Sequence, residues 1–176
     1  MNTENIMEYS NKTMMVESLI KSDANFEIFR KLPLVADMNI ADVMSLFGCM
    51  TAKTYTESEI IYHAGEEATG RMYIILKGKI NVKSESGYKY DSLRTGDVFG
   101  LFSFLDENRK HSATIIVEQD LTVLTMDRSY FNLIVVEEPK LGNKLMRLMF
   151  SLLSKKASEL EVEYSHMHNF AFGGKV

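Results

Sequence analysis

A change in the period of the hydrophobic pattern constrains the fold of this chain more than any other feature. Between Ala52 and Asp127 apolar and polar residues alternate, whereas the flanking segments repeat with the period of a helix. Eight short strands punctuated by turns predict a β sandwich or barrel, of which a jelly roll is one form. The eight runs are Lys53–Thr56, Ile60–His63, Met72–Leu76, Ile80–Lys83, Tyr88–Leu93, Asp97–Phe99, Ser112–Val117 and Leu121–Met126.

Glycines between these runs mark the expected turns. Gly78-Lys79 separates the third run from the fourth, and Ser86-Gly87 separates the fourth from the fifth. Glycine adopts the positive φ that tight hairpin turns require. The sequence therefore predicts a tight hairpin at each of these two places.

Helical periodicity on both sides of the β region divides the chain into segments. Before the β region, Asn39 is the expected N-cap of a helix, with Asp42 in the capping-box position. After the β region, Glu138-Pro139 separates a short helix from a long one. The expected organisation is an N-terminal extension over 1–25, a β domain with its preceding helices over 26–136, a long helix over 137–165 and a tail without a clear element over 166–176.

The predicted long helix carries an unusually wide apolar surface. One stripe consists of Leu141, Leu145, Leu148 and Leu152, and an adjacent one of Met146, Met149, Leu153 and Leu160. Such a helix must cover the β domain, pair with a second copy, or do both. We expect a homodimer that forms through this helix.

Composition and charge argue against several classes of function. The net charge of −4 gives no general attraction to nucleic acid, and Lys155-Lys156 followed by Glu159, Glu161 and Glu163 is typical of a solvated helix face. The N-terminus lacks a secretory leader pattern, and no run approaches the ~20 apolar residues that span a bilayer. We expect a cytoplasmic protein that contacts neither DNA nor a membrane directly.

Several short motifs occur in the order found in a known family. Gly65-Glu66, the run Met72–Gly78, the sequence Gly-Asp-Val-Phe-Gly over 96–100, and His111-Ser112-Ala113-Thr114 follow one another. From Phe26 to Leu160 the chain resembles the cyclic nucleotide-binding domain of the catabolite activator protein and of related regulators and channels. The resemblance implies a mainly β fold with flanking helices, namely an eight-stranded jelly-roll (double-stranded β-helix) barrel with N-terminal helices and a long C-terminal helix.

The resemblance also implies a ligand site at the phosphate-binding cassette. The family's ribose-binding Glu corresponds to Leu101, and its phosphate-binding Arg corresponds to His111 when the segment is aligned without a gap. A small change of register could instead present Arg109 or Lys110. Since both charged ligands differ, we do not expect tight binding of cyclic AMP in the usual mode. The candidate ligand-binding residues are Phe99, Gly100, Leu101, Phe102, Arg109, Lys110, His111, Ser112 and Ala113.

Two functional hypotheses remain open from the sequence. In the first, the chain is a stand-alone sensor that binds a nucleotide or another small anion and signals through its long helix to a protein partner. Only about a dozen residues follow Tyr164, too few for a helix-turn-helix DNA-binding domain. In the second, Leu101 and Phe102 fill the pocket and the domain is a ligand-free scaffold. No cofactor other than a cyclic nucleotide is a candidate.

Neither an enzymatic nor a metal-binding role is expected. His63 and His111 are the only histidines of the predicted β region, and no strand carries a His-x-His pair. A metal site inside a β barrel would need histidines and carboxylates that converge on one point. The fold alone does not supply chemistry.

Overall fold

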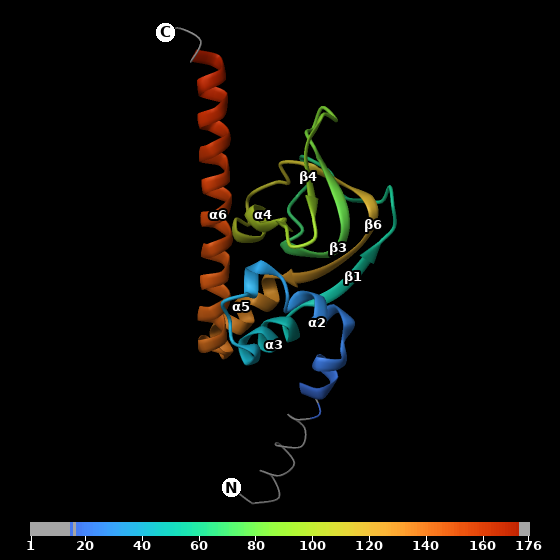
Figure 1. Ribbon diagram of the computed structural model, residues 1–176, viewed down its shortest axis with the longest axis vertical. Helices are drawn as coiled ribbons and strands as arrows, with labels where there is room; N and C mark the ends of the chain where they lie inside the picture. Colours follow the sequence, from blue (N-terminus) through green and yellow to red (C-terminus); the bar gives the residue numbers. More distant parts are fainter. Residues whose placement is uncertain (1–14, 16, 173–176) are drawn as a thin grey trace, which may run out of the picture.

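The computed structural model describes residue 15 and residues 17–172, which form a curved β sheet flanked by helices (Figure 1). The first 14 residues and Val16 of the expected N-terminal extension lie outside the described residues, and residues 17–22 are helical. The helices are α2 (Ala24–Phe29), η1 (Pro33–Val35), α3 (Ile40–Gly48), α4 (Leu101–Leu105), α5 (Arg128–Glu137) and α6 (Pro139–Phe172). The strands are β1 (Thr51–Tyr55), β2 (Ile60–Tyr62), β3 (Arg71–Lys83), β4 (Lys89–Arg94), β5 (Val98–Phe99) and β6 (Thr114–Asp127).

Two long strands, β3 and β6, form the centre of the sheet. They pair antiparallel from Arg71 opposite Asp127 to Lys83 opposite Thr114. β1 and β2 pair with β6, whereas β4 and β5 pair with β3. Every pairing is antiparallel, as the alternating pattern predicts.

The described residues form six strands, so the predicted number of eight was wrong. Gly78 lies within β3 with φ of 96°, where the register of β3 against β6 shifts. A Cβ at Gly78 would lie 2.3 Å from the carbonyl oxygen of Asp120, so the two backbones approach too closely for any side chain. Gly78 therefore marks a bulge inside one continuous strand, and the hairpin predicted there does not form. The last two predicted runs are likewise continuous, in β6.

The hairpin predicted at Ser86-Gly87 is confirmed. Gly87 has φ of 84°, and the Ser84 N–H donates to the Tyr88 carbonyl oxygen over 2.8 Å. This turn joins β3 to β4.

The alternation within β3 separates two hydrophobic cores. Met72 and Ile74 point toward the helices, where they pack with residues of α2, α3, α5 and α6. Tyr73 and Ile75 point to the other face, where they pack with β2, β5 and β6. The strand is buried on both faces because helices cover one side and the curved sheet encloses the other.

The helix before the sheet begins as the sequence predicts. The Asn39 side chain accepts a hydrogen bond from the Asp42 N–H over 3.0 Å, which confirms Asn39 as the N-cap of α3. Phe26 and Phe29 of α2 contact Phe47 of α3. These rings anchor the N-terminal helices beneath the sheet.

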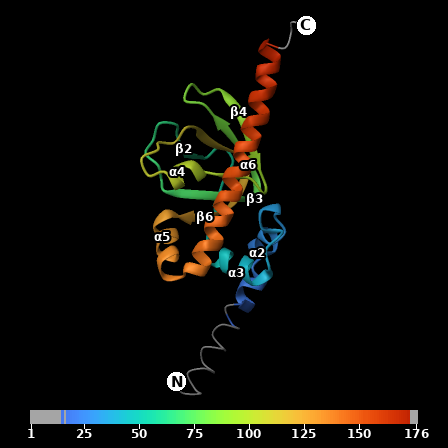
Figure 2. The same cartoon turned by 90° about the vertical axis from the view of Figure 1, so that its left-hand side faces the viewer.

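The long helix α6 runs beside the sheet and projects beyond it (Figures 1 and 2). Leu145, Leu148 and Met149 are buried against the helical core. The helix extends to Phe172, so residues 166–172, for which no clear element was expected, are helical. Within the described residues no helix, α6 included, combines the length and apolar content of a membrane crossing.

The exposed side of α6 carries a regular apolar stripe. Its residues are spaced alternately by four and three positions, and all except the half-buried Leu153 are exposed. Within the described residues, Leu153 also packs against the helical core, whereas the other stripe residues keep a large part of their surface exposed. The exposed stripe consists of Met146, Phe150, Leu153, Ala157, Leu160, Tyr164 and Met167.

A tight junction connects α5 to α6. Glu138 leaves helical geometry, with φ of −126° and ψ of 70°, and Pro139 begins the next helix. A Cβ at Gly142 would lie 2.8 Å from the Cα of Val135. The absence of a side chain at Gly142 thus lets the start of α6 cross α5 in backbone contact.

Candidate functional site

The cassette predicted from the sequence is a short helix that follows strand β5. Gly100 caps α4 in the left-handed conformation, with φ of 74°. A Cβ at this position would lie 2.6 Å from the Arg71 carbonyl oxygen, so only glycine lets the chain turn here against β3. The stacked rings of Tyr73 and Phe99, 4.5 Å apart, hold the preceding strand in place.

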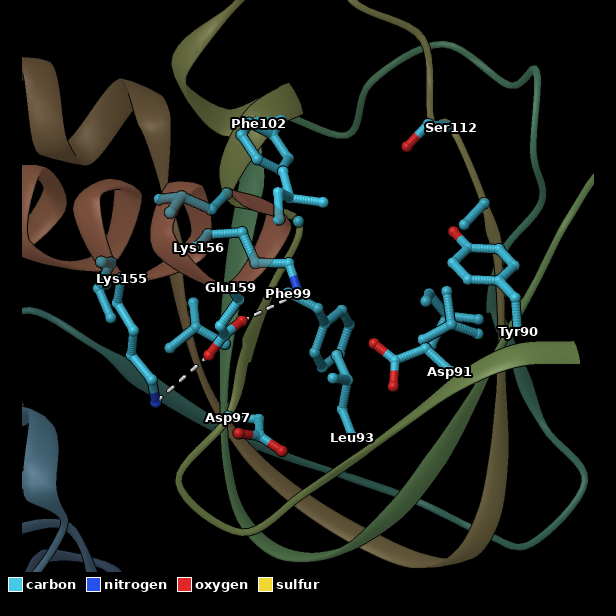
Figure 3. A pocket seen from close by; sticks show the side chains of 18 of the residues that line it. Tyr90, Asp91, Leu93, Asp97, Phe99, Phe102, Ser112, Lys155, Lys156 and Glu159 are labelled. Atoms are coloured by element: carbon cyan, nitrogen blue, oxygen red, sulfur yellow. Dashed lines mark hydrogen bonds and ion pairs between the residues drawn. The ribbon is translucent and has the colours of Figure 1, made fainter. Parts of the chain in front are cut away.

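A cavity of about 380 Å³ lies between the cassette, the sheet and α6 (Figure 3). Its size is within the range of small-molecule sites. The sheet and cassette contribute most of the apolar wall, and one face of α6 supplies the opposite wall. The lining includes, from the strands, Tyr62, Val82, Tyr90, Asp91, Leu93 and Ile115, from the segment before β5, Asp97, and from α6, Leu152, Lys155, Lys156, Glu159, Leu160 and Glu163.

Six of the nine predicted ligand-binding residues line this cavity. The structure brings together Phe99, Gly100, Leu101, Phe102, Ser112 and Ala113. Arg109, Lys110 and His111 are not among the lining residues. The cavity lining thus includes the cassette residues of the predicted set and leaves out its three basic residues.

His111 is buried beside the cavity, with 4% of its surface exposed. Its ring stacks on Tyr62 with centroids 3.7 Å apart, and its Nε2 accepts from the Thr69 N–H over 3.3 Å. The Nδ1 atom lies 3.4 Å from the Ser103 hydroxyl. Burial lowers the pKa of His111, and the nearby Glu66 opposes this effect. The neutral ring thus connects the cassette helix to the segment before β3.

Arg109 and Lys110 are exposed in the loop after α4. The Arg109 guanidinium lies 5.1 Å from the centroid of the Phe102 ring, and the Lys110 ammonium lies 3.2 Å from a Glu67 carboxylate oxygen. Leu101, in contrast, is buried and packs with the core of the helical side. Neither loop cation lines the cavity, although Arg109 lies over Phe102, which does.

Arg128, the first residue of α5, ties the cassette to the helices that follow the sheet. Its Nε donates to the Phe104 carbonyl oxygen over 2.5 Å, and its Nη2 donates to the Ser103 carbonyl oxygen. Phe104 also contacts Phe131 of α5 edge to face, with centroids 5.5 Å apart. These hydrogen bonds and this ring contact join α4 to α5.

The charged residues of α6 at the cavity were missed by sequence reasoning. Glu159 lies between Lys155 and Lys156, with contacts of 4.0 and 3.2 Å (Figure 3). In the sequence this pattern looks like an ordinary solvated helix face. Only the spacing of Lys155, Glu159 and Glu163, four residues apart on one face, could have suggested a shared surface.

The described side chains offer no metal site. Over residues 15 and 17–172, no three His, Cys, Asp or Glu side chains gather closely enough to hold a metal ion. The polar groups at the cavity are carboxylates, ammonium groups, and the hydroxyls of Ser112 and the tyrosines. They can bind a small molecule through hydrogen bonds and charge.

The curved sheet, its short cassette helix and the helix that closes the cavity together define a class of domain found in regulatory proteins. Residues 52–137 match the cyclic nucleotide-binding domain family. Over these residues the chain is similar to that family, as the order of its sequence motifs predicts.

Individual relatives agree with this assignment. The cyclic nucleotide-gated channel beta-3 of Canis lupus familiaris is 27% identical over 143 residues, which are 79% of this chain and 18% of the channel. The chain thus spans less than a fifth of the length of this relative.

Two solved structures share the fold. A cyclic nucleotide-binding domain from Methylobacillus flagellatus KT superposes with a TM-score of 0.65 at 22% identity, with 76% of each chain covered. The Thermus thermophilus catabolite activator protein superposes with a TM-score of 0.63 at 20% identity, with 77% of this chain and 62% of the other covered.

Proposed function

We propose that this chain is a regulatory module in which a small effector binds between the sheet and α6 and changes the position of that helix. The observation that carries the proposal is that one cavity is lined by the cassette, the strands and α6 together. A ligand that touches all three favours one arrangement of the helix over another. A binding role of this kind needs no catalytic group.

The described contacts supply a route for the signal. Arg128 and Phe131 connect α4 to α5, and the break at Glu138 allows α6 to pivot on α5. Hinges of this kind are a few residues at the ends of elements. We also propose that the sheet is a jelly roll, which the register shift of β3 against β6 at Gly78 supports.

The proposal is tested by thermal unfolding with a panel of cyclic mono- and dinucleotides, nucleosides and aromatic amines. A ligand of the folded state stabilises it by about 2.7 kcal/mol at one hundred times its Kd, which raises the Tm by roughly 5–10 °C for a chain of this size. At least one class in the panel is expected to give such a rise. No shift with any compound at millimolar concentration would contradict the proposal.

A matched pair of variants locates the effect. Ser112 lies exposed at the cavity, so Ser112→Trp is expected to block it and remove the ligand-induced rise in Tm. Ser86→Trp places the same side chain at the exposed hairpin tip and should retain the rise. Equal responses of the two variants would place the ligand elsewhere.

A second role, dimerisation, is favoured by the exposed stripe of α6. The alternating spacing of four and three is that of coiled-coil helices, and Phe150 and Tyr164 are 64% and 66% exposed. We infer that a second copy covers this stripe. Dimerisation is compatible with both functional hypotheses from the sequence, the sensor and the ligand-free scaffold.

A further inference from the structure

We propose that the cavity between the sheet and α6 selects uncharged or positively charged ligands and discriminates against anions, cyclic nucleotides among them. The inference rests on the proposed function, since it names the ligand class of the same cavity.

Negative charge predominates at the cavity. Asp91 and Asp97 line it from the sheet side, whereas α6 contributes Glu159 and Glu163. The cationic lining groups are the two ammonium groups of Lys155 and Lys156, so the lining carries a net charge of −2. An anion that enters meets net repulsion, and the partly desolvated site strengthens it.

Both lysines already have an anionic partner. Glu159 contacts the Nζ atoms of Lys155 and Lys156 over 4.0 and 3.2 Å. A phosphate could use these lysines only in competition with Glu159. No arginine lines the cavity, since the nearby Arg109 of the cassette loop lies over Phe102.

The carboxylates of the sheet side remain able to accept further hydrogen bonds. Asp91 accepts the Ser92 N–H over 2.7 Å through Oδ1, and Asp97 accepts the Arg94 N–H over 2.8 Å through Oδ2. Neither bond uses the second oxygen of the carboxylate. In Figure 3 the Asp91 carboxylate points toward the Phe99 ring, into the cavity. It can therefore receive an ammonium, amide or hydroxyl donor of the ligand.

The remaining wall is apolar and suits a flat hydrocarbon or aromatic body. The apolar lining includes Leu160 from α6 and, from the strands, Val82, Leu93, Phe99 and Ile115. Burial of such a body supplies the affinity, and the carboxylates select the charge of its polar end. The ligand class is therefore an aromatic or otherwise apolar molecule with an uncharged or cationic donor group.

The inference is tested with three probes that share one ring and differ in charge: tryptamine as the cation, tryptophol as the neutral alcohol and indole-3-acetate as the anion. Adenosine and cyclic AMP form a second pair. Affinities for the full chain are measured by NMR titration at low salt. We expect tryptamine to bind roughly tenfold or more tightly than indole-3-acetate, with tryptophol between them, and adenosine more tightly than cyclic AMP.

Variants test whether the cavity carboxylates cause this order of affinities. The double variant Asp91→Asn with Glu163→Gln should reduce the preference for tryptamine over indole-3-acetate by about tenfold, and leave tryptophol binding within about twofold. Glu161→Gln is the control, since Glu161 is exposed on the same helix and does not line the cavity. A preference unchanged by the double variant would overturn the inference.

The outcomes separate this inference from the proposed function. If indole-3-acetate or cyclic AMP binds at the cavity more tightly than its uncharged counterpart, the charge inference is wrong and the effector function stands. If none of the five probes and no compound of the wider panel binds, both are wrong.

Discussion

The imidazole of His111 is held on three sides and cannot turn toward the cavity without losing contacts. Tyr62 stacks on one face, the Thr69 N–H occupies Nε2, and the Ser103 hydroxyl lies near Nδ1. Because Nε2 accepts a hydrogen bond, the proton of the neutral ring is on Nδ1. Protonation of Nε2 would break the hydrogen bond that this nitrogen accepts from the Thr69 N–H. The residue that resembles an anion ligand in the sequence thus stabilises the folded cassette in its neutral form.

This environment predicts a dependence of stability on pH. Burial lowers the pKa of folded His111 below its ordinary value of 6.5, whereas the unfolded chain keeps about 6.5. The unfolded state therefore binds the proton more readily, and stability is full above about pH 6.5 and decreases as pH falls through the lowered pKa. We expect the Tm to fall between pH 7.5 and pH 5, and His111→Gln to show a shallower fall. The measurement is thermal unfolding of both proteins across this range, and parallel curves would contradict the assignment.

At the scale of the elements, the crossing of α5 and α6 determines where the cavity wall stands. Gly142 allows backbone contact with Val135, and the hydrogen bonds of Arg128 join α5 to the cassette. A change at either point moves α6 relative to the sheet. The geometry of the cavity is therefore controlled from a site at the other end of the helix.

The substitution Gly142→Ala tests this crossing. Its Cβ would lie 2.8 Å from the Val135 Cα, a backbone atom that cannot yield by a rotamer change. We expect a loss of about 1–3 kcal/mol in the free energy of unfolding, the usual cost of overpacking, measured by urea denaturation. Gly48→Ala is the matched control, because its nearest neighbour is the flexible Ile20 side chain at 4.0 Å. That change should be neutral or stabilise by up to about 1 kcal/mol, and equal effects of both changes would argue against a tight crossing.

Residues whose role is local could be predicted from the sequence, and residues whose role depends on a distant neighbour could not. The alternation located the β region, and Asn39 and Gly87 signalled their cap and turn correctly. Gly78 forms a bulge because of its approach to Asp120, which no local pattern reveals. The cassette side of the cavity is one local segment with recognisable motifs. Lys156 and Glu163 of α6 reach the cavity only through the fold, so the sequence suggested that they were solvated.

At the scale of the whole molecule, α6 has two faces with different tasks. One face packs on the domain through Leu145 and Met149, and the other presents the exposed stripe. A protein with so long an exposed apolar stripe gains by covering it. Pairing of two copies is the arrangement that this spacing favours.

Substitutions on the stripe test the dimer. The double variant Phe150→Glu with Tyr164→Glu places charges on the stripe and should shift the protein from dimer to monomer, raising the dissociation constant at least about a hundredfold. Val162→Glu is the control, because Val162 is 56% exposed on the same helix and lies off the stripe. Sedimentation velocity over a range of concentrations distinguishes the two species. A monomeric parent protein, or a double variant that sediments like its parent, would contradict dimerisation through α6.

Leu160 belongs both to the exposed stripe and to the wall of the cavity. A second copy seated on this leucine alters the surroundings of any molecule held beneath it, so subunit association and effector occupancy share one side chain. By thermodynamic linkage, each must then change the equilibrium of the other by the same factor. The concentration of effector needed for half-saturation should accordingly drift as the protein is diluted, and the direction of that drift tells whether the effector joins the subunits or separates them.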